Sequence, residues 1–425
     1  MDMQSKAKKL IEMIQTASVE WKPLGEVFDL KNGYTPSKSI KEYWENGSIP
    51  WFRMEDIREN GRILDSALQQ ISESAIKGGK LFPANSIIMA TSATIGEHAL
   101  ITVPFLANQR FTNLSLKPGF TDKFNIYFLY YYCFNLSEWC KKNTTTSSFA
   151  SVDMSGFKRF PIPIPPLETQ QKIVKILDKF TELEATLEAE LALRKRQYRY
   201  YRDFLLDFDN QIGGGIVDGY KGRLKDVVWK TLGEVGMLIR GNGLQKKDFT
   251  EDGIPAIHYG QIYTHYGTFA SKTKSFVSTR LAEKLKKAQY GDVLIAGTSE
   301  NIQDVMTPVG WLGGEIVFSG DMFAFRPNTE INTKYLTYML QTTMFQKYKE
   351  KYAQGTKVIR VKGENFLKFE IPIPPLAEQE KIVAILDKFD TLTHSISEGL
   401  PHEIALRRKQ YEYYREQLLA FPKAA

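Results

Sequence analysis

The hexapeptide Ile-Pro-Ile-Pro-Pro-Leu occurs twice in this chain, at residues 162–167 and again at residues 371–376. The offset of 209 positions continues without a gap into the Ile-Val-x-Ile-Leu-Asp-Lys-Phe runs at 173–180 and 382–389. Upstream, Trp-Lys-x-Leu-Gly-Glu-Val is present at 21–27 and at 229–235. Chance does not give several such matches in one order, so the sequence is an internal duplication.

Each copy predicts the same order of elements. Short β-rich runs such as 85–90 and 291–296 come first, and the proline-rich hexapeptide ends them and starts a long charged helix. Apolar residues in that helix step by three, four or seven, the spacing of a coiled-coil seam. The predicted seam residues are Ile173, Leu177, Phe180, Leu187, Leu191, Tyr198, Tyr201, Leu205 and Phe208 in the first copy, and Ile382, Leu386, Phe389, Leu392, Ile396, Ile404, Tyr411, Tyr414 and Leu418 in the second. We expect the second helix to kink or restart at Gly399-Leu-Pro401.

The length of these helices indicates how they pair. Forty residues at about 1.5 Å each span roughly 60 Å, which exceeds a compact domain of this size. We therefore expect the two helices to pair with each other in antiparallel fashion, although each could instead cover only its own domain. The predicted fold is α+β, with two globular α/β domains separated by two long antiparallel coiled-coil helices and related by a pseudo-two-fold axis.

This fold divides the chain into six segments. The predicted segments are an N-terminal helix at 1–20, a first domain at 21–166, a central spacer helix at 167–209, a linker at 210–228, a second domain at 229–375 and a C-terminal spacer helix at 376–421.

Composition sets broad limits on function. The 425 residues are 43% hydrophobic, enough for two cores, and carry a formal charge of +7. A basic excess suits a polyanionic partner, but it also suits an ordinary soluble domain. No apolar signal core and no run of 18 apolar residues is present, so we expect a cytoplasmic protein without a membrane partner. Cys133 and Cys140 lie seven apart in a predicted helix at 127–142 and are expected to be packing residues.

Sequence motifs for catalysis are missing. The best phosphate-loop candidate, 214–219, is followed by Tyr220-Lys221 rather than Gly-Lys-Ser/Thr. The five histidines lack metal-ligand spacing, and both Pro-Pro pairs precede leucine, so neither completes an adenine-methyltransferase tetrapeptide. The sequence therefore predicts a non-catalytic chain that holds no cofactor or metal of its own. A DNA-modifying enzyme is the rival that S-adenosylmethionine or ATP binding by the isolated chain would favour.

Two motifs resemble those of a known family. These are the first-copy run IPIPPL followed by E-x-Q-x-K-I-V-x-I-L-D-K-F, and R-K-x-Q-Y-x-Y-Y-R at 194–202, which is nearly repeated at 407–415. Over nearly its whole length the chain resembles the specificity subunits of type I restriction-modification enzymes, and residues 181–191 and 386–401 resemble the IC branch. The elements Gly33-Tyr-Thr-Pro-Ser-Lys38, Tyr43-Trp44 and Ile49-Pro-Trp51 resemble those of many recognition domains in that family. The second copy has Gly241-Asn-Gly-Leu-Gln-Lys246 instead, so its loop should differ in shape and in the sequence read.

The resemblance implies a function and a set of partners. Each target-recognition domain would read one half of a bipartite site in double-stranded DNA, and the helices would set the unread spacer. Two methyltransferase subunits carrying S-adenosylmethionine would dock on the helices, and restriction subunits using ATP and Mg would join them. A free-standing two-headed sequence-specific DNA-binding regulator is the alternative.

Helix lengths suggest the size of the unread spacer. If the centres of the two globular domains lie one turn of the DNA duplex apart, roughly 10 base pairs, and each half-site has about three to four pairs, the unread gap is roughly six pairs. Fourteen positions separate Phe180 from Arg194, whereas eighteen separate Phe389 from Arg407. Inserting four residues near Thr186 should therefore lengthen the gap by about one pair.

Polar and basic loop residues are the candidates for DNA contact, because they bond to phosphates and base edges. The candidates are Lys31, Tyr34, Ser37, Lys38, Arg53, Arg110, Lys141, Lys142, Thr144 and Ser147 in the first domain, and Lys246, Lys247, His258, Tyr259, Gln261, Thr356, Lys357 and Arg360 in the second. Each could also be an ordinary solvated side chain. Arg53 and the loop 141–148 are the preferred candidates, while His258 could be either a base contact or a satisfied loop histidine.

Several aromatic residues have an alternative role in packing. Tyr198, Tyr200 and Tyr201 could stack on bases, but the seam spacing favours packing for Tyr198 and Tyr201, with the nearby basic residues on a solvated or partner-facing side. Trp21 and Trp229 are expected to anchor the start of each domain.

Overall fold

The computed structural model describes residues 3–145, 150–208 and 227–422. The chain forms two compact units. Unit 1 comprises Met1–Ala185 and Arg407–Ala425, and unit 2 comprises Thr186–Leu406. Each unit therefore contains one predicted globular domain together with part of each long helix.

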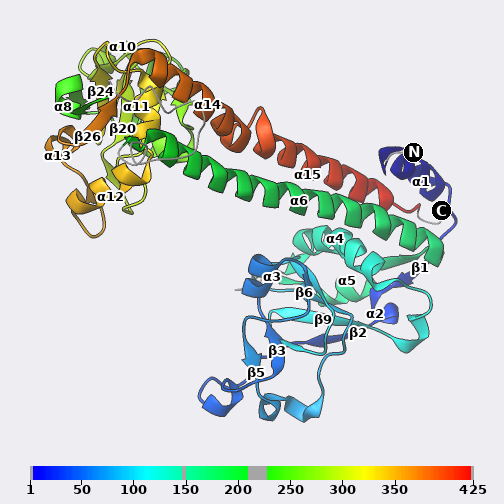
Figure 1. Cartoon of the computed structure of the whole chain (residues 1–425). Coiled ribbons are helices and arrows are strands. Elements are labelled where there is room, and N and C mark those ends of the chain that lie inside the picture. Colours follow the sequence, from blue (N-terminus) through cyan, green and yellow to red (C-terminus); the bar gives the residue numbers. More distant parts are fainter. Residues whose placement is uncertain (1–2, 146–149, 209–226, 423–425) are drawn as a thin grey trace. The chain divides into compact units, whose positions relative to one another are not determined.

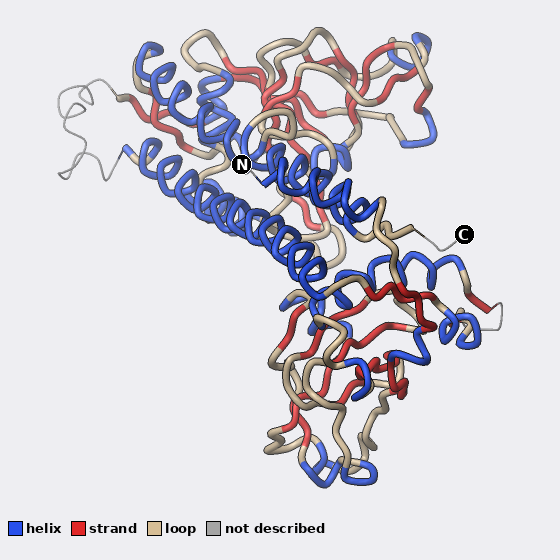
Figure 2. Tube along the Cα trace, turned by 90° about the vertical axis from the view of Figure 1, so that its right-hand side faces the viewer, coloured by secondary structure: helices blue, strands red, loops and turns tan. Residues whose placement is uncertain are grey.

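Unit 1 is built on a five-stranded sheet in the order β2-β9-β6-β7-β4, with β7 and β4 parallel and the other pairs antiparallel. A three-stranded sheet, β5-β3-β8, shares a hydrophobic core with it. The strands of both sheets are among those drawn in red in Figure 2. The strands are β1 Glu20–Pro23, β2 Phe28–Asn32, β3 Ile49–Phe52, β4 Ile63–Leu64, β5 Gln70–Ile71, β6 Ser86–Ala90, β7 His98–Ile101, β8 Leu106–Ala107, β9 Phe111–Leu116, β10 Thr144–Thr145, β11 Ser151–Val152 and β12 Pro161–Ile164. The helices are α1 Met3–Gln15, α2 Leu24–Val27, α3 Met54–Asn60, α4 Ile126–Lys142 and α5 Met154–Arg159, followed by the start of α6 Leu167–Leu206.

Unit 2 repeats this topology. Its main sheet has the order β14-β24-β20-β22-β17, and the middle of its second sheet, β18-β16-β23, corresponds to β5-β3-β8. The strands are β13 Val228–Thr231, β14 Gly236–Arg240, β15 Phe249–Thr250, β16 Ile254–Ile257, β17 Phe269–Ala270, β18 Ser275–Val277, β19 Lys287–Ala288, β20 Val293–Ala296, β21 Thr298–Ser299, β22 Pro308–Trp311, β23 Ile316–Phe318, β24 Met322–Pro327, β25 Ile359–Arg360 and β26 Glu370–Ile373. The helices are α8 Leu232–Val235, α9 Tyr259–Thr264, α10 Thr279–Ala282, α11 Thr333–Met339, α12 Thr343–Tyr352, α13 Gly363–Leu367, α14 Leu376–His394 and α15 Gly399–Leu418. The duplication predicted from sequence is confirmed in the fold.

Strand β6 explains why the central runs of each copy are uninterrupted and apolar. All five of its residues are buried. Ile87 and Met89 join the core that contains α4, whereas Ile88 and Ala90 join the core under β3 and β8. Because successive side chains of a strand point to opposite faces, a strand covered on both faces is apolar at successive positions. The first residue of β6, Ser86, is buried with its hydroxyl bonded to that of Ser115 at 3.1 Å. Strand β20 divides its residues between two cores in the same way.

The hexapeptide connects each globular domain to the long helix that follows it. Its first residues form β12 and β26, which pair antiparallel with β1 and β13. Ile and Pro alternate, so the missing proline N–H groups lie along one edge of the strand, and a strand with a single partner tolerates that. Helices α6 and α14 then begin at the leucine that ends the motif. Trp21 is partly buried against the core and Trp229 is 37% exposed, so the backbone pairing anchors the second domain more than its tryptophan does.

The long helices pair reciprocally. In unit 1 the start of α6 lies against the end of α15, where Phe180 stacks on Tyr414 with ring centroids 5.2 Å apart. In unit 2 the C-terminal part of α14 lies against the end of α6, where Phe389 stacks on Tyr201 at 5.4 Å. Glu184 also forms an ion pair with Arg408 in unit 1. In unit 1 the partner of the later α6 residue, Glu184, comes earlier in α15 than the partner of Phe180. In unit 2 Tyr198 contacts His394, whereas the later Tyr201 contacts the earlier Phe389. The predicted antiparallel pairing is therefore confirmed within each unit (Figure 1). Each copy's helix starts on its own domain and ends in the unit of the other copy.

The second helix restarts where the sequence indicated. Helix α14 ends at His394 and α15 begins at Gly399, which has φ +72°. A Cβ at Gly399 would lie 2.4 Å from the Thr391 carbonyl oxygen, so glycine is required there. The prediction that Ile396 belongs to the seam was wrong. This residue is 87% exposed because it lies in the segment between the two helices.

Two buried glutamines hold the long helices to their domains. Gln170 on α6 donates from Nε2 to the carbonyl oxygens of Lys123 and Pro165, both at 2.8 Å, and accepts from the Asn125 N–H at 2.8 Å. In unit 2, Gln379 on α14 makes three matching bonds, to Glu330, Pro374 and Asn332. Both side chains are fully buried. This explains the glutamine that follows the hexapeptide in both copies, because the amide satisfies three backbone groups that water does not reach.

The aspartate of Ile-Leu-Asp-Lys-Phe has a related role in each unit. The Tyr131 hydroxyl of α4 donates to Asp178 at 2.6 Å, and the Tyr338 hydroxyl of α11 donates to Asp387 at 2.7 Å. Lys334 also pairs with Asp387 at 2.6 Å. Each helix is thus joined to a domain helix by a charge-assisted hydrogen bond.

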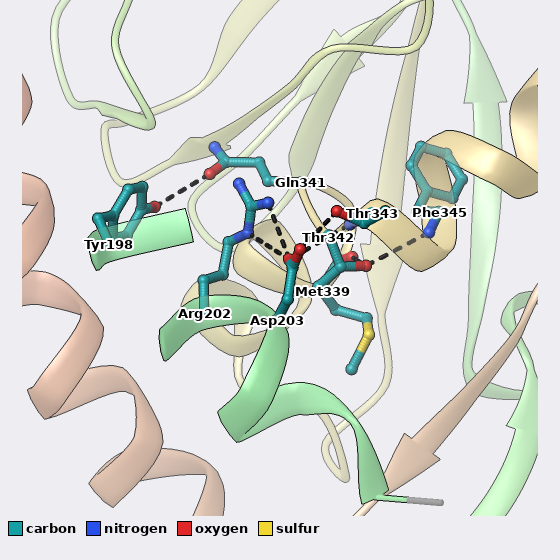
Figure 3. Close-up of polar contacts among 8 residues, drawn as sticks. All are labelled: Tyr198, Arg202, Asp203, Met339, Gln341, Thr342, Thr343 and Phe345. Atoms are coloured by element: carbon teal, nitrogen blue, oxygen red, sulfur yellow. Dashed lines mark hydrogen bonds and ion pairs between the residues drawn. The ribbon is translucent and has the colours of Figure 1, made fainter. Parts of the chain in front are cut away.

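Within unit 2, a polar network joins the end of α6 to the globular domain (Figure 3). The Tyr198 hydroxyl donates to Gln341 at 3.2 Å, and Arg202 donates to Asp203 Oδ1 from Nε at 3.0 Å and from Nη2 at 2.8 Å. Asp203 in turn accepts from Thr343 at the start of α12. Tyr198 is buried, as expected for a seam residue. Arg202 is only 8% exposed, so the expectation that the basic residues here form a solvated side was wrong for it, because its charge is paired within the fold.

The predicted N-terminal helix is α1. Its apolar face, formed by Ala7, Leu10, Ile11 and Ile14, is buried in the core of unit 1. Most of the predicted linker at 210–228 lies outside the described residues.

Candidate nucleic-acid interface

The loop after β2 in unit 1 is held in place by two tryptophans. Trp51 Nε1 donates to the Tyr34 carbonyl oxygen at 2.9 Å, and Trp44 Nε1 donates to that of Ser37 at 3.0 Å. The two rings meet edge to face at 5.0 Å. A Cβ at Gly33 would lie 2.2 Å from the Ala107 carbonyl oxygen, so only glycine permits this close approach. These contacts account for the glycine and tryptophans of the motif.

Three predicted DNA contacts come together beside this loop. Lys38, Arg53 and Arg110 line one depression of about 640 Å³. Its lining also contains Thr35, Lys41, Trp44, Glu45, Trp51, Met54, Glu55, Gln69, Asn108 and Gln109. Four cationic side chains and three amides outnumber the two carboxylates here, which suits a polyanionic ligand with hydrogen-bonding edges. Lys41 and the three amides were missed from sequence, because their proximity depends on the way β3, β5 and β8 bring separate loops together.

The other candidates in unit 1 are more dispersed. The Tyr34 hydroxyl donates to the Ala75 carbonyl at 3.1 Å and accepts from the Lys77 N–H at 2.8 Å, so it supports the loop. Ser37 bonds to Ser39 at 2.8 Å. Lys31 is exposed on the edge strand β2.

Lys141, Lys142 and Thr144 follow one another at the end of α4. Lys141 pairs with Glu138 at 2.7 Å and, with Thr144, Arg58 and Arg62, lines a second depression of about 670 Å³. Lys142 is exposed. Ser147 and most of the tip of this hairpin lie outside the described residues.

In unit 2, His258 and Gln261 cap helix α9. The Gly260 N–H donates to His258 Nδ1 at 3.3 Å, and the His258 N–H donates to Gln261 Oε1 at 2.9 Å. Gln261 also donates to Ser275 at 2.6 Å. Desolvation lowers the pKa of His258, which favours its neutral form. Of the two roles open for His258, the structure supports the satisfied loop histidine, and its contact with DNA stays a prediction.

The remaining candidates of unit 2 lie on two loops. Lys246 and Lys247 are exposed in a short 3-10 helix, and Tyr259 opens α9 with its N–H bonded to Ser319 at 3.0 Å. Thr356, Lys357 and Arg360 belong to the hairpin that ends in β25, which corresponds to the β10–β11 hairpin of unit 1. Arg360 lines a depression of about 630 Å³ with Arg240 and Lys362, two residues that the sequence did not single out.

Buried ionisable groups elsewhere have structural roles. His98 is buried against Phe134, and its burial together with Arg62 lowers its pKa to about 3. Lys349 donates to the carbonyl oxygens of Gln303 and Val305, both at 2.6 Å, and burial lowers its pKa to about 8. Burial raises the thiol pKa values of Cys133 and Cys140, so these cysteines are packing residues with little thiolate character.

Over residues 3–145, 150–208 and 227–422, the structure has no group of three or more His, Cys, Asp or Glu side chains arranged to hold a metal ion. Among the helices that can be described, none is both long enough and apolar enough to cross a membrane.

Comparison with known proteins identifies the family. The model for the type I restriction modification DNA specificity domain matches this chain twice, at residues 18–193 and 225–406. The chain belongs to this family. The two matches coincide with the two copies of the duplication, so each target-recognition domain with the helix that follows it is one family domain.

Relatives of full length agree with this assignment. The chain is 45% identical over 405 residues to the specificity subunit of the type I restriction enzyme EcoprrI of Escherichia coli, and the match covers 93% of each chain. It is 31% identical to the EcoR124I/EcoR124II specificity subunit of the same species, over 99% of this chain and 98% of that one. The prediction of a non-catalytic type I DNA specificity subunit is confirmed.

The fold also has a solved counterpart. A structure from work on complex assembly and conformational transition of the type I restriction-modification system matches with a TM-score of 0.64 over 95% of this chain and 98% of that one. The two sequences are 16% identical, so this likeness concerns the fold alone.

Proposed function

We propose that each unit reads one half of a bipartite site in double-stranded DNA, and that the long helices keep the unread gap between the halves constant. The observation that supports this most strongly is the reciprocal helix pairing, in which α6 starts on the domain of unit 1 and ends packed in unit 2. Basic and amide side chains on the loops supply groups that bond to phosphates and base edges.

Two methyltransferase subunits that carry S-adenosylmethionine are the partners expected on the helices. Exposed apolar side chains recur at matching places in the two copies. Leu193 and Leu406 are 55% and 51% exposed, and Tyr200 and Tyr413 are 63% and 58% exposed. Large exposed apolar residues at repeated positions fit one partner that binds twice. Restriction subunits that use ATP and Mg would join this assembly in the cytoplasm.

Selection from a randomised duplex library tests this function. The full chain assembled with its methyltransferase subunits should enrich duplexes that carry two specified blocks separated by a gap without base preference. One continuous block, or enrichment without sequence preference, would contradict the proposal. If the isolated chain enriched the same two blocks equally well and without those subunits, the free-standing regulator would be favoured.

A further inference from the structure

Arg53 and His258 occupy the same place in the two units. Each directly follows a strand that begins with Ile-Pro, β3 in unit 1 and β16 in unit 2. Each is also the residue that precedes the first turn of a short helix, α3 or α9. Since β3 and β16 are equivalent strands of equivalent sheets, Arg53 and His258 occupy equivalent backbone positions. The position is kept while its chemistry differs between the units.

The Arg53 side chain is positioned but has donors to spare. Its guanidinium carbon lies 5.7 Å from the centre of the Trp51 ring, and its Nε is buried without a hydrogen-bond partner among the described residues. The nearest carboxylate oxygen, on Glu55, is 4.0 Å from Nε, beyond hydrogen-bond distance. The side chain is 34% exposed and lines the depression. A guanidinium with a fixed stem and donors available to solvent is preorganised for a bidentate acceptor.

The surroundings of Arg53 match the edge of a base pair beside a phosphate. Lys38, Lys41 and Arg110 provide positive charge around the depression, while Asn108 and Gln109 provide amide groups. Salt-dependent phosphate contacts hold a protein on DNA, and paired donors or acceptors then read the bases.

The equivalent residue in unit 2, His258, has fewer hydrogen-bond donors available than Arg53. Its Nδ1 already accepts from Gly260, and the residue is 8% exposed. With Nδ1 as acceptor, a neutral imidazole has only the Nε2 hydrogen left to donate. It therefore lacks the two-donor fork of an arginine.

We propose that Arg53 is a specificity-determining residue that reads a guanine in the half-site recognised by unit 1, donating two hydrogen bonds to O6 and N7 of that base. This pairing is the usual bidentate contact of arginine in the major groove. Trp51 acts as a positioning residue, because its ring holds the guanidinium. The inference rests on the proposed function, in which each unit reads one half-site.

The test uses the complete complex with its methyltransferase subunits. Methylation rates are measured on duplexes in which each specified base pair of the wild-type site is replaced in turn. For Arg53→Gln and Arg53→Met, which both lack a cationic donor for O6 and N7, the preference for one G·C pair in one half-site should fall by about 5- to 150-fold, with the other pairs unchanged. Arg159→Gln, which removes an exposed arginine at the end of α5, is the matched control and should change no preference.

Three results would overturn the assignment. These are an unchanged preference at every pair, a loss spread over both half-sites, and a loss at a pair other than G·C. Arg53→Met keeps an unbranched apolar stem beside Trp51 but has no donor, so it replaces Arg53→Gln as the test if that variant does not fold. A wild-type complex that methylated DNA without sequence preference would contradict the proposed function itself, which distinguishes the two failures.

Discussion

The reciprocal helix pairing predicts which aromatic residues are energetically coupled. Phe180 and Tyr414 are 1% and 5% exposed and stack with an interplanar angle of 21°. Replacing a buried Phe by Ala costs about 3–5 kcal/mol, and an aromatic pair contributes about 0.5–1.5 kcal/mol beyond its burial. A double-mutant cycle of Phe180→Ala with Tyr414→Ala should therefore give a coupling energy of about 0.5–1.5 kcal/mol.

The assay is native-state hydrogen exchange of the full chain, because it reports stability separately for amides of each unit. The matched control cycle combines Phe180→Ala with Tyr201→Ala, because Tyr201 is the counterpart of Tyr414 but lies in unit 2, where it stacks on Phe389. These two substitutions should be additive to within about 0.3–0.5 kcal/mol. Additivity for Phe180 with Tyr414, or equal coupling in both cycles, would refute the reciprocal pairing.

Three further predictions concern buried groups and helix length. Gln170→Leu should lower the free energy of unfolding of unit 1 by about 3–6 kcal/mol in chemical denaturation, because three buried backbone groups lose their partner. The control Gln171→Leu changes an exposed residue and should alter the free energy by less than about 0.5 kcal/mol. An equal effect of the two substitutions would contradict the role of Gln170. Burial and the neighbouring Arg62 and Arg415 lower the pKa of His98 to about 3 in the folded state. The unfolded chain therefore takes up the proton first, and the free energy of unfolding should fall as the pH drops from about 6.5 towards 3, by about 2 kcal/mol at pH 5. His98→Phe should remove that part of the loss between pH 7 and pH 5, and a parallel fall in both proteins would count against it. Four residues inserted after Thr186 lengthen α6 by about 6 Å and should widen the unread gap by about one base pair; methylation mapping that showed altered half-site bases and the original gap would defeat this ruler.

Much of the fold could be predicted from the sequence because the two copies of the duplication can be compared with each other. Equal runs at a constant offset imply equal topology, and the apolar spacing after the hexapeptide located α6, α14 and α15. The spacing did not reveal that Ile396 lies in the break between helices, since an apolar residue has the same seam register whether or not the helix continues through it. The burial of Arg202 was missed for a different reason, because its partner Asp203 is fixed by Thr343, a residue distant in sequence.

The candidate interface could be predicted only in part. Lys38, Arg53 and Arg110 were chosen as polar loop residues and do line one depression. His258 and Gln261 fitted the same description, yet they cap a helix, a role that depends on backbone geometry. Residue type alone does not separate a donor that faces solvent from one that is already bonded within the fold.

Single-molecule sequencing of adenine methylation in a host that carries the complete system would show directly whether the two units read two half-sites at a fixed interval. If they do, the methylated sites share one motif with two specified blocks, a gap of fixed length without base preference, and a methylated adenine in each block. A motif with one continuous block, or two blocks separated by a variable gap, would contradict the proposed function.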